Sequence, residues 1–357
     1  MVGDPPRGRQ TFCIPAFRAQ SNFLSLAETM RATVIFLRLT LLPAALLLSG
    51  CMNHYLIHPE RDPAGVATWS EEVTRGPLKM HLEWAQPSGV GPFPTVIVHP
   101  EGGGLASDMK GVTRDLAQHG YLAVGVDYER LLDGKFRRNT FAWREDSDTL
   151  AALKVVRGRP QVDRARIAAL GFSQGAIYSL LMAAHAPDIK AVVVYYPVTD
   201  FRKWFDTERD WGSRLAFRVI EWHFRRESGA ASDAEFEEML RRASPMTYVD
   251  SIRAPLLLIH GADDTSAGVE ESSRLERALR ERGREVELLV VPGAGHVFNF
   301  RDPEPARRAW DATLEWLRVH IGQSGDAAKP PVARARRGAQ AREAASLRHR
   351  AARADRV

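Results

Sequence analysis

The chain has 357 residues, of which 45% are hydrophobic and 26% charged, so a globular chain with a sizeable core is expected. Its net charge of +5 gathers at the ends, because residues 325–357 hold nine Lys or Arg against three acids and residues 1–50 hold five Arg against two acids. The stretch between them is acidic overall, so the charge gives no sign of a nucleic-acid partner for the folded part and none is expected.

The N-terminal segment resembles a secretory signal. Residues 30–50 place two arginines ahead of an apolar run from Leu39 to Leu48, which is too short for a comfortable membrane span. Residues 1–29 have no place in such a signal, so we expect them to be an upstream extension, with Met30 as the true start. The signal predicts that the folded domain lies outside the cytoplasm.

The segment ends in Leu48-Ser49-Gly50-Cys51, which resembles a bacterial lipobox, where the cysteine is acylated and begins the mature protein. The only other cysteine is Cys13, upstream of the signal, so no disulfide framework is expected inside the domain. We therefore predict a lipid on Cys51, a membrane-anchored protein at the periplasmic face of the cell envelope, and a tether over residues 51–70. Met52 favours an outer-membrane destination. An uncleaved anchor, or an ordinary signal with a chance cysteine, is the alternative.

From residue 71 to residue 200, short apolar runs alternate with helical segments. This pattern is typical of a parallel, doubly wound sheet covered by helices on both faces, and it places the chain in the α/β class. The predicted strands span residues 71–73, 78–84, 95–98, 121–127, 167–170 and 191–196, and the predicted helices span residues 109–119, 145–157 and 176–185. The alternation resumes later with strands over 255–260 and 287–291 and helices over 269–283 and 304–320.

Residues 200–250 interrupt this alternation. Aromatic and aliphatic residues are interleaved with charges at helical spacing, and a second amphipathic helix is predicted over Ala234–Arg242. We expect a helical cap insertion that lies over the sheet, with aromatic side chains that serve mainly for packing. Residues 322–357 are rich in Ala and Arg without apolar periodicity and are expected to form a disordered basic tail.

The central motif is Gly171-Phe172-Ser173-Gln174-Gly175, between a predicted strand and a predicted helix. In this context a G-x-S-x-G sequence requires a tight turn that forces the serine into a strained conformation and lifts its hydroxyl clear of the sheet. The N-terminus of the following helix then points its N–H groups at negative charge that develops beside the serine. The motif predicts Ser173 as a nucleophile, with an ordinary glycine-serine loop as the alternative.

A serine nucleophile needs a base to take its proton. His296 follows the strand over residues 287–291 in the glycine-rich sequence Pro292-Gly293-Ala294-Gly295-His296. The carboxyl ends of parallel strands gather the functional groups of an open sheet, so this loop is expected beside Ser173. We predict His296 as the base.

The base in turn needs an orienting acid. Asp263 and Asp264 follow the strand over residues 255–260, and we favour Asp264 because a turn after His260-Gly261 would present it. Asp200 is a weaker alternative, and His260 is expected to have a structural role. The chain order serine, aspartate, histidine is that of α/β-hydrolases and differs from both protease orders.

The sequences TVIVHPEGGGL, RDLAQHGYLAVGVDY, GFSQG and APLLLIHGADDTSAGVEESSRLERALRERGREVELLVVPGAGHVF together resemble the dienelactone hydrolase family of α/β-hydrolases, with a secondary similarity to prolyl-oligopeptidase-like catalytic domains. The resemblance implies an α/β-hydrolase domain over residues 71–321. It also implies that Glu101 lies near the nucleophile and that the N–H groups of Gly102 and Gln174 form an oxyanion hole. The chain departs from the name-giving enzymes at the nucleophile, which is a cysteine there and Ser173 here.

These features favour a serine hydrolase that cleaves small-molecule carboxylic esters without a metal or cofactor. A peptidase of the oligopeptidase type is the alternative within enzymes, although the short segment between Cys51 and the first strands leaves no room for the β-rich domain that filters substrates in those enzymes. An inactive envelope binding module on a hydrolase fold is the alternative outside enzymes. The acyl and alcohol groups of the substrate and the oligomeric state are not determined by the sequence.

Overall fold

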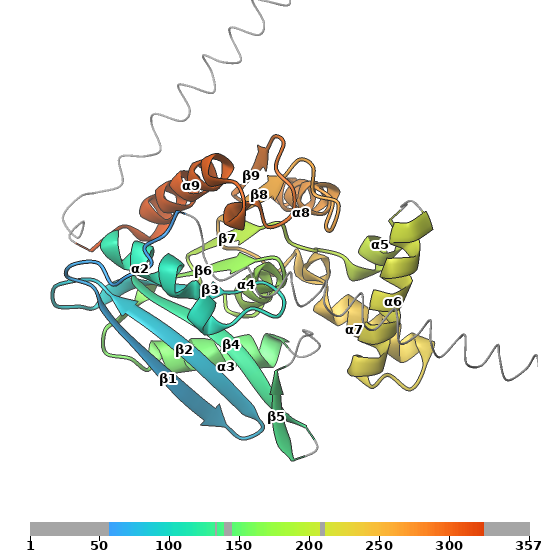
Figure 1. The fold of residues 1–357 in the computed structure, drawn as a ribbon, viewed down its shortest axis with the longest axis horizontal. Helices are drawn as coiled ribbons and strands as arrows, with labels where there is room; N and C mark the ends of the chain where they lie inside the picture. Colours follow the sequence, from blue (N-terminus) through green and yellow to red (C-terminus); the bar gives the residue numbers. More distant parts are fainter. Residues whose placement is uncertain (1–56, 133, 139–144, 208–210, 325–357) are drawn as a thin grey trace, which may run out of the picture. The chain divides into compact units, whose positions relative to one another are not determined.

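The structure is a computed structural model that describes residues 57–132, 134–138, 145–207 and 211–324. The expected upstream extension, the signal segment, Cys51 and nearly all of the basic tail lie outside the described residues. The described strands form one sheet in the order β1-β2-β4-β3-β6-β7-β8-β9, with β5 paired to β4 (Figure 1). The strands are β1 (Ala67–Arg75), β2 (Leu78–Gln86), β3 (Phe93–His99), β4 (Leu122–Leu132), β5 (Lys135–Arg138), β6 (Val162–Phe172), β7 (Ala191–Tyr195), β8 (Leu256–Gly261) and β9 (Val286–Val291).

The sheet is mostly parallel. Neighbouring strands are parallel in the part of the sheet that runs β4-β3-β6-β7-β8-β9. At the other end, β1 pairs with β2, β2 with β4 and β5 with β4, all antiparallel. The predicted doubly wound α/β architecture is therefore confirmed. The β5 hairpin was not predicted, because its four residues, Lys-Phe-Arg-Arg, carry no alternating apolar signal.

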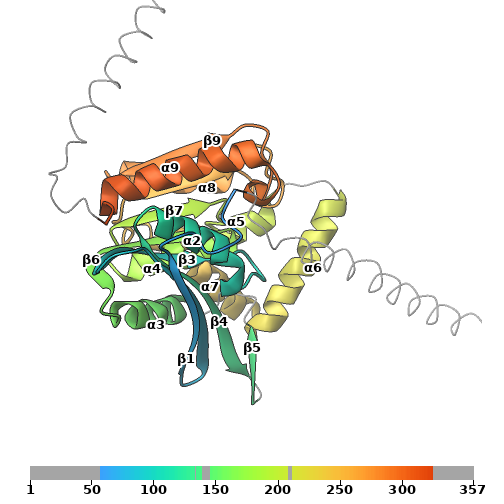
Figure 2. The same ribbon diagram turned by 60° about the vertical axis from the view of Figure 1, so that its left-hand side comes forward.

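Helices cover both faces of the sheet (Figures 1 and 2). The side chains of β3 alternate between two cores, with Ile97 in one and Val96 and Val98 in the other, as the period of two along a strand requires. The first core is closed by α3 (Glu145–Arg157), α4 (Gln174–His185) and α8 (Glu270–Glu281), and the second by α2 (Lys110–Gln118) and α9 (Pro303–Ile321). Because β3 is buried on both faces, its sequence reads as a continuous apolar run.

Residues between β7 and β8 form the predicted helical insertion, which comprises α5 (Phe201–Asp206), α6 (Trp211–Ser228) and α7 (Asp233–Ala243). Its small core joins Phe201, Phe236 and Leu240 to Ile177 and Leu181 of α4. The insertion is thus attached through α4, at the side of the sheet (Figure 1), which refines the expectation that it lies over the sheet.

One arginine ties the insertion together. Arg202 on α5 donates to Asp206 on its own helix, to Glu221 on α6 and to Glu237 on α7, with distances of 2.9 to 3.0 Å. A cation shared by three carboxylates links the three helices of the insertion in addition to their small apolar core.

The expected tether over residues 51–70 is corrected over its described part, because residues 57–62 pack on the domain. His58 Nδ1 lies 2.7 Å from Asp115 Oδ2 on α2, and its ring is 4.4 Å from that of Trp310 on α9. Arg114 on α2 donates to Asp62 Oδ1 over 2.6 Å. A polar sequence without periodicity can still be fixed by specific ion pairs, which a pattern search does not detect.

Candidate active site

Ser173 occupies the turn between β6 and α4, at the carboxyl edge of the sheet. Its backbone has φ 50° and ψ −113°, a conformation that non-glycine residues rarely adopt. Its N–H donates to the carbonyl oxygen of Tyr195 over 3.0 Å, which ties the turn to the end of β7. The strained conformation expected from the motif is therefore present at the serine itself.

The two glycines of the motif are required by close approach of the backbone. A Cβ on Gly171 would lie 2.1 Å from the carbonyl oxygen of Gly175, and a Cβ on Gly175 would lie 2.2 Å from the carbonyl oxygen of His99. No side chain fits at either distance. Glycine at these two positions lets α4 begin directly against β6 and the end of β3.

His296 lies in the loop between β9 and the short 3-10 helix η3 (Phe298–Phe300). Its Nε2 is 3.1 Å from Ser173 Oγ, although 123 positions separate the two residues in the chain. The ring of Tyr196 packs against it, with 4.6 Å between ring centroids. The structure therefore brings His296 within hydrogen-bond distance of Ser173, with the ring of Tyr196 tilted against the imidazole.

Asp264 is the acid beside His296. Its Oδ2 lies 2.6 Å from His296 Nδ1, and its Oδ1 accepts hydrogen bonds from the backbone N–H groups of Ser266 and Ala267, each over 2.9 Å. Burial raises the pKa of Asp264, but hydrogen bonds from His260 and His296 outweigh burial and hold it well below its usual range. A buried carboxylate that stays ionised fixes the His296 tautomer with the proton on Nδ1, which leaves Nε2 free to accept the serine proton.

The two other candidate acids lie elsewhere. Asp263 is exposed beside the buried Asp264. Asp200 caps the N-terminus of α5, where its side chain accepts from the backbone N–H of Lys203 over 3.1 Å.

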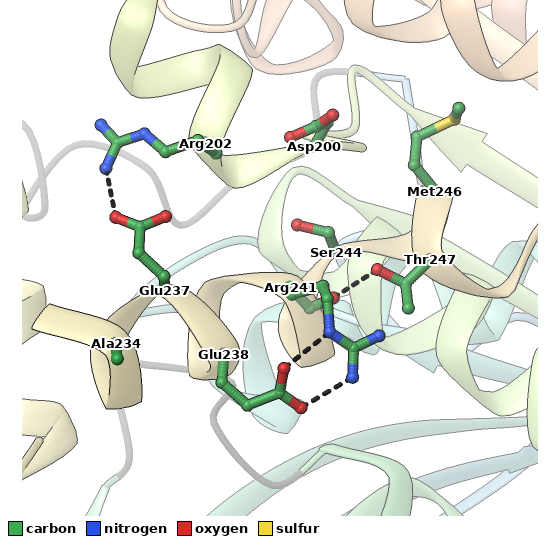
Figure 3. Close-up of a pocket in the computed structure, with 9 residues that line it drawn as sticks. All are labelled: Asp200, Arg202, Ala234, Glu237, Glu238, Arg241, Ser244, Met246 and Thr247. Atoms are coloured by element: carbon green, nitrogen blue, oxygen red, sulfur yellow. Dashed lines mark hydrogen bonds and ion pairs between the residues drawn. The ribbon is translucent and has the colours of Figure 1, made fainter.

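Asp200 also lines a groove of about 550 Å³ on the insertion, in which Arg202 pairs with Glu237 and Arg241 pairs with Glu238 (Figure 3). None of the residues that line this groove belongs to the Ser173, His296 and Asp264 cluster.

His260 has the structural surroundings that were expected of it. Its ring is fully buried, with Nδ1 2.7 Å from Ser272 Oγ and Nε2 2.7 Å from the carbonyl oxygen of Ala267. Its Nε2 is also 3.4 Å from Asp264 Oδ2. His260 thus braces the loop that carries Asp264 through Ala267, and it lies near the same carboxylate oxygen that His296 contacts.

The residues expected to form an oxyanion hole lie side by side. A Cβ on Gly102 would lie 2.9 Å from Oε1 and 3.7 Å from Cβ of Gln174, the residue after the serine. Glu101 is buried, and its charge contributes, after burial, to raising the pKa of Tyr196 well above its usual value. Gly102 therefore lies against the side chain of Gln174, the residue after Ser173, and the oxyanion-hole role of the two N–H groups stays a prediction.

Two residues of this region were missed from the sequence. Tyr196, directly after β7, has φ 40°, donates from its hydroxyl to Asn299 Oδ1 and packs on His296. His99, at the end of β3, is fully buried between Ser179 Oγ at 3.0 Å and Tyr128 OH at 2.9 Å, and burial lowers its pKa to about 3. In the sequence, both residues appear only as an aromatic side chain with a polar atom at the end of an apolar strand. That pattern does not distinguish a site residue from a core residue.

Across the part of the chain that the structure describes, no cluster of three or more His, Cys, Asp or Glu side chains is arranged to hold a metal ion. No helix among these residues is long and apolar enough to cross a membrane.

A mostly parallel sheet with a strained serine between strand and helix, and an aspartate and a histidine on later loops at the same edge, defines an α/β-hydrolase-fold protein. The family model described as "Dienelactone hydrolase family" matches residues 81–321. The chain therefore belongs to the dienelactone hydrolase family, as the sequence resemblance indicated.

Relatives agree with this family, and a solved structure shares the fold. A protein of Methylorubrum extorquens named "Putative carboxymethylenebutenolidase" is 27% identical over 288 residues, covering 74% of this chain and 87% of the relative. A protein of Bradyrhizobium sp. named "Probable 2-oxo-3-(5-oxofuran-2-ylidene)propanoate lactonase" is 26% identical over 268 residues, covering 71% and 94%. The acylaminoacyl peptidase of Pyrococcus horikoshii has the same fold, with a TM-score of 0.58 and 21% identity over 72% of this chain but only 42% of the peptidase.

Proposed function

We propose that this protein is a serine hydrolase that cleaves carboxylic esters through an acyl-enzyme. The observation that carries the proposal is the continuous hydrogen-bonded chain from Ser173 Oγ to His296 Nε2 (3.1 Å) and from His296 Nδ1 to Asp264 Oδ2 (2.6 Å). A serine hydroxyl is hardly ionised near neutral pH, so its attack depends on a base held in this way.

In the acylation step, Ser173 Oγ forms a bond to the carbonyl carbon of the ester while its proton passes to His296 Nε2. The carbonyl oxygen becomes an oxyanion, which the N–H groups of Gly102 and Gln174 stabilise. Removal of one such donor typically costs roughly 2.7 to 4 kcal/mol of transition-state stabilisation. The imidazolium then gives its proton to the departing alkoxide oxygen, and the buried carboxylate of Asp264 stabilises the charged ring in the meantime.

In the deacylation step, His296 takes a proton from a water molecule, whose oxygen attacks the acyl carbon. The bond between that carbon and Ser173 Oγ breaks, and the serine oxygen recovers its proton from His296. The carboxylic acid leaves and the site returns to its starting state. The whole cycle consumes one water and needs no metal or redox cofactor.

The family and its members support a proposed substrate class. Two relatives carry names of lactone-cleaving enzymes, and a lactone is a cyclic ester, so small-molecule esters and lactones are the proposed substrates. The serine nucleophile, where the name-giving enzymes have cysteine, favours general ester hydrolysis. Peptides are the competing substrates, since the fold also occurs in an acylaminoacyl peptidase.

A fluorophosphonate probe tests the chemistry, because it reacts covalently with an activated serine. We expect the wild type to be labelled and Ser173→Ala to remain unlabelled. A series of nitrophenyl esters of increasing chain length, with lactones and peptide substrates alongside, then assigns the substrate class. Labelling that does not depend on Ser173, or its absence in the wild type, would favour an inactive binding module.

We also propose that the protein is anchored to the cell envelope through lipid on Cys51, at the periplasmic face. Support comes from the sequence alone, through the signal-like residues 30–50 and their ending Leu48-Ser49-Gly50-Cys51. In that arrangement five residues separate Cys51 from Ile57, which packs on the domain. So short a spacing would keep the domain close to the membrane surface.

A further inference from the structure

Four large apolar side chains lie along the outer face of α6. Trp211, Leu215, Val219 and Trp222 are 79%, 60%, 57% and 58% exposed, and we refer to them as the α6 stripe. Their spacing of four, four and three residues places them on one face of the helix. A contiguous apolar face that stays in contact with water marks an interaction site more often than a chance exposure of single residues does.

The inner face of α6 fixes this orientation. The ring of Phe217 is 5.0 Å from that of Trp204 on α5, and the ring of Phe224 is 6.3 Å from the same indole. Glu221, on the same inner side, accepts from Arg202. Because the helix is held by these contacts, the α6 stripe faces away from the rest of the insertion, and Figure 2 shows α6 standing at the outer edge of the domain.

Cationic side chains border the stripe. Arg214 and Arg218 are exposed one position before Leu215 and Val219. They line a groove of about 620 Å³ together with rings of the insertion and the side chains of Asp206 and Glu221. Neither forms an ion pair with a residue that the structure describes. Near the other end, the guanidinium of Arg226 lies 5.7 Å from the Trp222 ring, which is a cation–π distance. The apolar side chains of the stripe are thus bordered by arginines.

We propose that the α6 stripe docks on the surface of an anionic lipid bilayer, with α6 lying in the plane of the interface. Tryptophan and arginine are the side chains that favour this region, since the indole is amphipathic and the guanidinium pairs with anionic headgroups while its stem stays apolar. A second copy of the chain in an antiparallel two-fold contact through the stripe fits less well, because Arg214 and Arg218 of the two copies would lie on the same side of the contact.

Docking in this way has a consequence for the candidate active site. Trp204, which packs on α6, donates from Nε1 to the carbonyl oxygen of Ser266 over 2.7 Å, two positions after Asp264. The insertion that contacts the bilayer therefore also contacts the loop that carries the buried acid. The docking surface itself does not depend on the proposed function.

A local probe on the full-length chain tests the docking. In a background with Cys13→Ser and Cys51→Ser, Leu215→Cys is labelled with a polarity-sensitive fluorophore, and Glu281→Cys, an exposed position on α8, serves as the matched control. Both proteins are titrated with vesicles of phosphatidylcholine alone and of phosphatidylcholine with phosphatidylglycerol. We expect a blue shift of the label at position 215 with anionic vesicles only, and none at position 281.

A second variant tests the cations. Arg214→Gln with Arg218→Gln should raise the lipid concentration needed for half the shift about 30-fold, since each basic residue near an anionic surface contributes about fivefold to binding. An unchanged label at position 215, an equal shift at position 281, or an equal shift with phosphatidylcholine alone would overturn the proposal. A shift that appears without lipid as the protein concentration rises would assign the stripe to a second copy of the chain instead.

Discussion

The imidazole of His296 lies between a carboxylate and a hydroxyl, with Nδ1 2.6 Å from the buried Asp264 and Nε2 3.1 Å from Ser173 Oγ. Asp264→Asn keeps the size of the acid but cannot accept the Nδ1 proton with the same strength, so we expect kcat to fall roughly 10⁴-fold. Asp263→Asn, at the exposed neighbouring position, is the matched control and should change kcat by less than about tenfold. Steady-state kinetics on a nitrophenyl ester compare the two variants. If the Asp263 variant were the more damaged, Asp263 and not Asp264 would be the acid that orients His296.

The close approach at Gly175 predicts a stability effect. Gly175→Ala would place a Cβ 2.2 Å from the carbonyl oxygen of His99 and 2.3 Å from that of Pro100, and neither backbone atom can move without shifting β3. We expect the free energy of unfolding to fall by about 3 kcal/mol or more. Gly295→Ala, where the nearest atom would be 3.8 Å away, is the control and should change stability by no more than about 1 kcal/mol. Urea unfolding measures both variants. Equal losses of stability in Gly175→Ala and Gly295→Ala would contradict the claim that close backbone approach requires glycine at position 175.

His99 predicts a pH dependence of stability. Burial lowers its pKa to about 3 in the folded protein, against 6.5 in the unfolded chain, so the unfolded state takes up the proton first as the pH falls. The stability that the neutral His99 contributes to the folded protein is fully present above pH 6.5. As the pH falls to 5, the free energy of unfolding drops by about 2 kcal/mol through this group. His99→Asn should be less stable at pH 7.5 and should lose about 2 kcal/mol less between pH 7.5 and pH 5. Urea unfolding of both proteins measures this, and parallel pH profiles would show that His99 is not the group responsible.

The lipid anchor makes a prediction about Cys51. Wild type expressed with labelled palmitate should take up the label and fractionate with membranes, because several acyl chains on one residue bind far more tightly than a single chain, at roughly 0.8 kcal/mol for each buried methylene. Cys51→Ser should carry no label, and Cys13→Ser is the control that should keep it. A wild type without label, or one found in the cytoplasm, would end the lipoprotein proposal and leave the hydrolase proposal intact.

The fold could be predicted because its core strands have strong local signals. The apolar run of β3 and the alternation of strands and helices follow from burial on two faces, which depends on residue type alone. The neighbourhood of Ser173, Asp264 and His296 could be predicted because parallel strands present their carboxyl ends at one edge. Residue types along the chain were sufficient for the first inference, and the order of the strands and loops for the second.

The remaining features depend on contacts that the sequence does not specify. Tyr196 packs on His296 because the chain leaves β7 with φ 40°, and nothing in its neighbours requires that conformation. The insertion aromatics were expected mainly as packing residues, which is correct for Trp204 and Phe217 and wrong for Trp211 and Trp222. Helix α6 is apolar on two faces, and periodicity alone cannot tell which face is covered.

The central claim is that Ser173 and His296 act as one unit, and a double-mutant cycle on kcat tests it most directly. Ser173→Ala and His296→Ala should each lower kcat for a nitrophenyl ester by roughly 10⁴- to 10⁶-fold, and the double variant should be no more than about tenfold worse than either one, because removing the nucleophile leaves the base with nothing to activate. Losses that multiply in the double variant would contradict the account, since they would mean that His296 acts independently of the proton on Ser173.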